Sequence, residues 1–214
     1  MLHGWVAHGL PPARKTFRPG QSPATLLPVT TSLPPSGTLL LCIDLQPVFL
    51  RAVADGARVQ RRAEFAVAAA VGLGLPVAFT EQVPQKLGGT APELTALAPA
   101  APVFGKTTFS ALADEAIRAA LLHRGKTEHL LLCGVETPVC VYQTAIAALA
   151  AGLQVTLLSD ALGARRADDA VACLTALRHA GAHVLPSETV FYALLHEVEH
   201  PFFKAYTQLV KSHA

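Results

Sequence analysis

The sequence lacks the features that mark three common classes of protein. Glycine, proline or a charged residue interrupts every apolar run before it reaches the ~18 residues of a membrane span. No basic cluster exceeds a pair such as Arg61-Arg62, and the net charge is only +2, which argues against a nucleic-acid surface. No G-x-G-x-x-G follows the first predicted strand, and G-x-x-x-x-G-K-[ST] occurs nowhere. We therefore expect no membrane partner, no nucleic-acid partner and no cofactor.

Cysteine is scarce and shows no pairing pattern. The four cysteines are Cys42, Cys133, Cys140 and Cys173, without any C-x-x-C, and the first two fall in predicted buried strands. This usage is typical of reduced thiols in a reducing compartment and not of a disulfide framework.

Acidic residues are absent from the first part of the chain. The first acid is Asp44, and residues 1–37 contain seven prolines. We interpret 1–37 as a Pro-rich extension with little regular structure, and 38–214 as one domain. The missing acids fit an organelle transit peptide, but the prolines argue against an amphipathic helix. A cytoplasmic location is therefore the prediction, with organelle import as the weaker alternative.

Short apolar runs alternate with helical patterns over the rest of the chain, in which 51% of all residues are hydrophobic and 15% are charged. The pattern predicts an α/β fold: a three-layer α/β/α sandwich, Rossmann-like, around a six-stranded parallel sheet. The predicted strands are 38–43, 75–80, 103–104, 129–133, 154–158 and 183–185. The predicted helices are 48–73, 93–98, 111–123, 138–151, 167–180, 189–197 and 202–210.

Three reactive side chains follow strands of this predicted sheet. Asp44 ends the first strand, Lys106 follows the third, and Cys140 follows the fourth. Ligands of such sheets bind beyond the carboxyl ends of the strands, so we expect the three side chains to share one site. Each has a simpler alternative: Asp44 as the cap of a turn, Lys106 as a solvated loop lysine, and Cys140 as a small buried apolar residue.

The sequence pattern around Cys140 predicts a strand, then a turn, then a helix. Thr137 occupies the predicted N-cap and Pro138 the first helical position, so Cys140 falls in the first turn. Free N–H groups and the helix dipole would stabilise a thiolate there.

The three side chains together suit acyl transfer to cysteine. Lys106 would lower the pKa of the thiol, and Asp44 would take its proton and later activate water. The backbone N–H groups of Glu136 and Cys140 would hold the oxyanion. The predicted reaction is hydrolysis of an amide-type C–N bond of a small molecule through a thioester. The alternative is a catalytically silent binding or scaffold protein with the same fold.

Three residues near this site are candidates for contact with substrate. Gln82 would begin the loop above the carboxyl ends of the strands, and its amide would hydrogen-bond to a polar group of the substrate. Glu136 either contacts substrate or pairs with a neighbouring arginine, and Phe109 is either a pocket wall or a core aromatic.

Four motifs carry a resemblance to a known family. They are LCIDLQ at 41–46, FGKTTFS at 104–110, CGVETPVC at 133–140 and SDA at 159–161. With these motifs the chain resembles the isochorismatase-like cysteine hydrolases, which include nicotinamidases and N-carbamoylsarcosine amidase. The resemblance implies a catalytic triad of Asp44, Lys106 and Cys140. It also implies a cis peptide bond between Val135 and Glu136 that aims the oxyanion donors.

Three further segments resemble one branch of this family, the isochorismatase domain-containing proteins. They are TEQVPQKLGGTAPEL at 80–94, PSE at 186–188 and HPFFK at 200–204. Sheets of this class often associate, and an exposed Phe202-Phe203 pair would suit a subunit contact. We therefore expect a homo-oligomer.

The departures from the family pattern restrict the chemistry. Metal-dependent nicotinamidases carry an Asp and two His after the second strand, whereas residues 81–90 contain neither. No metal is therefore predicted, and nicotinamide is a poor candidate substrate. Isochorismatases proper lack the nucleophilic cysteine, so Cys140 argues against vinyl-ether cleavage.

Overall fold

The computed structural model describes residues 37–122 and 126–213. The extension predicted for 1–37 lies outside these residues apart from Gly37, and so does His123 of a predicted helix. None of the helices within the described ranges combines the length and apolarity needed to cross a membrane.

The core of the fold is one sheet in which six strands run parallel, in the order β3-β2-β1-β4-β5-β6. The strands are β1 (Thr38–Ile43), β2 (Val77–Gln82), β3 (Val103–Lys106), β4 (His129–Val135), β5 (Gln154–Gly163) and β6 (His183–Leu185). The predicted six-stranded parallel sheet is thus confirmed. Strands β2 and β3 lie on one side of β1, whereas β4, β5 and β6 lie on the other, so the strand order reverses between β1 and β4. Parallel sheets bind their ligands at such a point.

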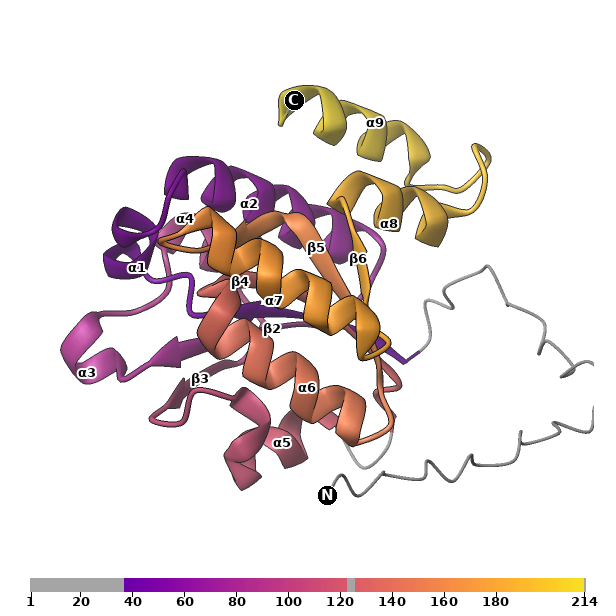
Figure 1. The fold of residues 1–214 in the computed structure, drawn as a ribbon. Helices are drawn as coiled ribbons and strands as arrows, with labels where there is room; N and C mark the ends of the chain where they lie inside the picture. The colour runs from indigo at the N-terminus through magenta and orange to yellow at the C-terminus, as the bar shows by residue number, and fades with distance from the viewer. Residues whose placement is uncertain (1–36, 123–125, 214) are drawn as a thin grey trace, which may run out of the picture. The chain divides into compact units, whose positions relative to one another are not determined.

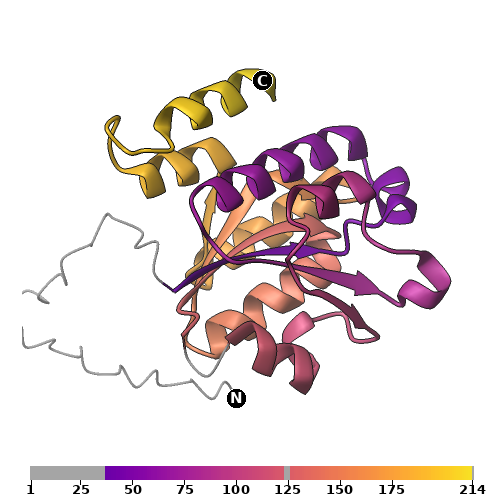
Figure 2. The same ribbon diagram turned by 180° about the vertical axis from the view of Figure 1, so that it is seen from behind.

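Helices cover both faces of the sheet, as Figures 1 and 2 show from opposite sides. One face packs on α1 (Pro47–Ala52), α2 (Gly56–Gly72), α4 (Pro92–Leu97), α8 (Ser187–Leu195) and α9 (Phe203–Ser212). The other packs on η1 (Ala111–Ala113), α5 (Glu115–Leu122), α6 (Tyr142–Ala150) and α7 (Ala167–His179). Alternate residues of β1 enter the two cores: Leu40 and Cys42 face α2, and Leu41 and Ile43 face the opposite layer. The three-layer sandwich is therefore confirmed.

Several predicted elements have different bounds in the structure, among them the helix at 48–73 and the strand at 75–80. The predicted helix 48–73 is two helices, because the chain turns at Asp55 (φ 54°) and Gly56. A Cβ at Gly56 would lie 1.8 Å from the Leu50 carbonyl oxygen, so only glycine allows this close approach. Strand β2 ends at Gln82 and not at Thr80, because its last residues pair with β3. A short helix, α3 (Pro84–Leu87), was not predicted.

The Phe202-Phe203 pair is not the exposed contact surface that the sequence suggested. Both side chains are partly buried and pack on the core beneath α9. The Phe202 ring occupies the space beside Gly72, where a Cβ would lie 1.9 Å from it. The basis for a subunit contact at these residues was therefore wrong.

A buried histidine makes the stability of the fold depend on pH. His129 is 2% exposed, its Nε2 lies 2.8 Å from the Thr156 hydroxyl, and its Nδ1 has no partner. Burial, aided by the charge of His183, lowers the pKa of His129 from 6.5 to about 4. The unfolded chain binds the proton first as pH falls, so stability is complete above pH 6.5 and decreases towards pH 4. The expected loss is on the order of 3 kcal/mol.

Urea unfolding from pH 7 to pH 4 measures this dependence. His129→Gln should flatten the profile, whereas His179→Gln, at an exposed position, should leave it unchanged. Equal slopes in the wild type and His129→Gln would contradict the assignment.

Candidate active site

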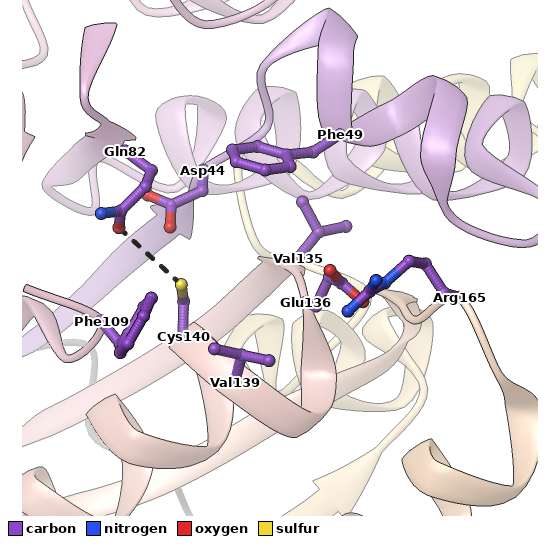
Figure 3. Close-up of a pocket in the computed structure, with 9 residues that line it drawn as sticks. All are labelled: Asp44, Phe49, Gln82, Phe109, Val135, Glu136, Val139, Cys140 and Arg165. Atoms are coloured by element: carbon purple, nitrogen blue, oxygen red, sulfur yellow. Dashed lines mark hydrogen bonds and ion pairs between the residues drawn. The ribbon is translucent and has the colours of Figure 1, made fainter. Parts of the chain in front are cut away.

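A cavity of about 290 Å³ opens beyond the carboxyl ends of β1 and β4, where the strand order reverses. The Asp44 carboxylate and the Cys140 thiol both line it (Figure 3). Lys106 does not reach the cavity surface but lies directly behind Asp44. The three side chains predicted to share a site are thus brought together.

Asp44 is held from two sides. Its Oδ2 lies 2.7 Å from Lys106 Nζ, and its Oδ1 accepts a hydrogen bond of 2.8 Å from the Thr80 hydroxyl. The residue is 1% exposed and has φ 51°, a backbone conformation that is uncommon outside glycine. Its carboxylate forms no cap to a helix, so the simpler alternative for Asp44 is wrong.

Lys106 is a buried residue and not a solvated loop lysine. Its side chain is 0% exposed. The ammonium donates to three oxygens: Asp44 Oδ2, Gln82 Oε1 at 2.6 Å and the Thr108 carbonyl at 3.2 Å. Its three N–H donors are therefore all used, and its position is fixed.

Cys140 lies in a tight turn between β4 and α6. The Val135–Glu136 peptide bond is cis, as the resemblance implied. A π-helical turn, η3 (Thr137–Val141), follows it and presents Cys140 to the cavity. Thr137 was predicted as the N-cap, but Glu136 has that position, and the Thr137 hydroxyl donates to the Gly163 carbonyl at 3.0 Å. This bond ties the turn to the end of β5.

The predicted lowering of the Cys140 pKa is wrong for the resting site. Burial and the charge of Asp44 together raise the pKa of this thiol to about 12, because the lowering by Lys106 offsets them only in part. The physical reason is that burial of the thiol and the adjacent Asp44 charge outweigh the effect of Lys106, which is already engaged by Asp44 and two other acceptors. Cys140 is thus a neutral thiol at rest, beside a carboxylate able to take its proton.

The predicted oxyanion donors belong to the turn that carries the sulfur, with Glu136 at its N-cap and Cys140 inside η3. Within the described ranges, the Glu136 N–H donates to no carbonyl in the turns, caps and loops of the chain. The Glu136 carbonyl, in contrast, accepts from Val139 and Val141 at 3.0 and 3.2 Å. The N–H groups of Glu136 and Cys140 stay the predicted oxyanion donors.

Gln82 faces the cavity with an amide that is already bonded. Its Oε1 accepts from Lys106 and lies 4.0 Å from Cys140 Sγ, and its Nε2 donates to the Thr107 carbonyl at 3.1 Å. Sequence reasoning missed the residue that fixes it, Gln46. Gln46 Oε1 accepts from the Gln82 N–H at 2.7 Å, and its Nε2 donates to the Gln82 and Gly88 carbonyls.

The remaining sequence candidates also line the cavity. Phe109 is 55% exposed, so the alternative of a core aromatic is wrong. Glu136 pairs with Arg165 at 2.9 Å while facing the cavity. Arg165 was not predicted, although it follows the true end of β5, where the strand-end rule would have found it. Sequence reasoning also missed three apolar lining residues, which are Phe49, Val135 and Val139.

The turn depends on glycine at one position. Gly134 has φ 123°, and a Cβ there would lie 2.0 Å from the Ile43 carbonyl oxygen on β1. Gly152 also has positive φ (81°), but nothing lies within 4 Å of its Cβ position. Gly134→Ala should therefore cost about 1–3 kcal/mol more in unfolding free energy than Gly152→Ala, because it adds a clash to the same backbone strain. Equal losses of unfolding free energy in the two variants, measured with urea, would show that β1 and β4 can move apart enough to relieve the clash.

No group of three or more His, Cys, Asp or Glu side chains suited to a metal ion occurs among the residues that the structure covers.

Comparison with known proteins assigns the chain to a family. The isochorismatase domain model matches residues 38–189. Isochorismatase domain-containing protein 2 from Bos taurus is 39% identical over 84% of this chain and 85% of its own length. The protein belongs to the isochorismatase domain family, and the predicted resemblance is confirmed. This superfamily includes hydrolases.

Two solved structures share the fold. MAR1 ribonuclease from Caenorhabditis elegans is 30% identical with a TM-score of 0.79, covering 84% of this chain and 92% of that one. YcaC from Escherichia coli, described as an octameric hydrolase of unknown specificity, is 22% identical with a TM-score of 0.75, covering 85% and 96%.

Proposed function

We propose that the protein is a cysteine hydrolase that cleaves an amide-type C–N bond of a small molecule through a thioester on Cys140. The observation that carries the proposal is the shared cavity. The Cys140 thiol and the Asp44 carboxylate both line it, and the Lys106 ammonium holds that carboxylate at 2.7 Å.

The first step is attack of the Cys140 sulfur on the substrate carbonyl carbon. The thiol proton passes to Asp44 as the S–C bond forms, because a thiol with a pKa of about 12 is not ionised at rest. The carbonyl oxygen becomes an oxyanion between the Glu136 and Cys140 N–H groups. Lys106 keeps the Asp44 carboxylate oriented throughout.

The second step releases the amine. Asp44 returns its proton to the leaving nitrogen, the C–N bond breaks, and a thioester remains on Cys140. A water molecule then attacks the thioester carbon while Asp44 takes one of its protons. The C–S bond breaks, the sulfur regains a proton from Asp44, and a carboxylic acid leaves.

The size and charge of the cavity favour a small molecule. The C. elegans relative is named a ribonuclease, but the cavity here is lined by a single cation, Arg165, which pairs with Glu136, and Lys106 is buried behind Asp44. Nucleic-acid affinity depends on several accessible cations.

A homo-oligomer and a cytoplasmic location stay predictions. Light scattering with size-exclusion chromatography tests the oligomeric state.

The test is formation of an acyl-enzyme. Purified protein is incubated with small amides and ureido compounds, and with p-nitrophenyl acetate as an activated probe. Intact-mass and peptide analysis should place the acyl group on Cys140, with release by hydroxylamine. Cys173, which is partly exposed, provides the internal control thiol.

The catalytically silent alternative gives a different result. Acylation at Cys173 but not at Cys140, or acylation unaffected by Cys140→Ser, would contradict the hydrolase proposal and favour a scaffold role.

A further inference from the structure

Resting on the proposed function, we infer that the cavity selects a short acyl group that is apolar and uncharged. The substrate class is then a neutral amide of a small carboxylic acid, without a carboxylate or an ammonium on the acyl side.

The walls of the cavity around the sulfur are apolar. Phe49 comes from α1, Val135 from the end of β4, Val139 from η3 and Phe109 from the loop after β3. Figure 3 shows the two rings on different sides of Cys140, with Val139 beneath. An acyl chain on Cys140 would therefore contact hydrocarbon from four separate segments and gain by leaving water.

The three charged side chains that line the cavity, Asp44, Glu136 and Arg165, are all already paired. Asp44 pairs with Lys106, and Glu136 pairs with Arg165 at 2.9 Å. A carboxylate on the substrate would face two carboxylates, with the lining cation Arg165 already paired to one of them. An ammonium would find both carboxylates already paired, Asp44 with Lys106 and Glu136 with Arg165. Either ion would lose its hydration without a free partner of opposite charge, which is costly. The charge pattern thus favours a neutral ligand.

The dimensions limit the length of the acyl group. At about 290 Å³ the cavity lies at the lower end of small-molecule pockets, which begin near ~300 Å³. Phe109 lines the cavity and is 55% exposed. A bound acyl group would cover that ring, so Phe109 is the side chain whose removal should change selectivity most.

The test compares activated esters that differ at one end of the acyl chain. The p-nitrophenyl esters of butyrate, of succinate and of 4-trimethylammoniobutyrate share a four-carbon acyl chain and a leaving group. In each case the Cys140 sulfur displaces p-nitrophenol, and the burst of nitrophenolate and the mass on Cys140 report acylation. After division by each ester's rate with N-acetylcysteine, butyrate should react on the order of 100-fold faster than either charged ester.

A series of variants tests whether the Phe109 side chain causes the preference for the butyryl ester over the charged esters. Phe109→Ala should slow butyryl transfer about tenfold and leave the slow charged esters within twofold, while Phe109→Leu should restore most of the loss. Val198→Ala is the matched control, since Val198 is also an exposed apolar side chain (70%) and is not among the lining residues. Its rates should equal those of the wild type.

The outcomes separate the inference from the proposed function. Acylation of Cys140 at equal normalised rates by all three esters, or faster by a charged one, would overturn the inference and leave the hydrolase proposal standing. A selective loss of succinyl transfer in Arg165→Gln would also overturn it, because Arg165 would then recognise an anion. No acylation of Cys140 by any ester would overturn both.

Discussion

Lys106→Met should destabilise the protein by about 3–5 kcal/mol, because it leaves the Asp44 carboxylate buried without its cation. The pair is completely enclosed: the two side chains are 0% and 1% exposed, and their charged atoms lie 2.7 Å apart. The Thr80 hydroxyl would still donate to the carboxylate, but it carries no charge. Urea unfolding at pH 7 measures the loss.

The double variant Asp44→Asn/Lys106→Met is the control. It removes both charges while keeping the shape of each side chain, so it should be more stable than Lys106→Met alone. If the losses of unfolding free energy from the two single substitutions simply add in the double variant, Asp44 and Lys106 are not coupled. Lys106 then does not stabilise the fold by neutralising Asp44.

The position of the site was predictable because parallel strands end at the same edge. Asp44, Lys106 and Cys140 are far apart in sequence, yet each lies at or after the carboxyl end of a strand, so the strand-end rule predicts that they share one site. The cis peptide after Val135 came instead from the resemblance to a family. Spacing alone gave no sign of it.

The electrostatics of the site could not be predicted in the same way. Proximity to Lys106 suggested a lowered pKa at Cys140, but the sign depends on burial and on which acceptors the ammonium already has. Those are Asp44, Gln82 and the Thr108 carbonyl, and only the folded arrangement reveals them. A helix dipole argument cannot weigh these competing interactions.

Arg165 was missed because the end of β5 was misjudged. The apolar pattern predicted a strand ending at Leu158, whereas β5 continues to Gly163 after an irregular register against β4. The continuation includes Ser159 and Asp160, which are polar and read as a turn. Asp160 is held there by Arg62 at 2.7 Å, a long-range contact that no local pattern encodes.

Asp44→Asn should stop turnover while making the Cys140 thiol easier to ionise. The asparagine keeps the shape of the side chain but cannot accept the thiol proton, so acyl transfer should fall by about 10²–10⁴-fold. The charge of Asp44 and its hydrogen bond raise the pKa of Cys140, and their removal should lower that pKa from about 12. Iodoacetamide labelling of Cys140 should therefore reach half of its maximum at a lower pH than in the wild type.

Lys106→Met should move the same labelling profile in the opposite direction, because Lys106 lowers the pKa of Cys140. The measurement is the pH dependence of labelling at each cysteine by mass spectrometry, at a temperature where every variant is folded. Cys173 lies on α7, outside the cavity lining, and its profile should not change in either variant. Shifts of the same sign in the two variants, or wild-type turnover in Asp44→Asn, would exclude Asp44 as the proton acceptor.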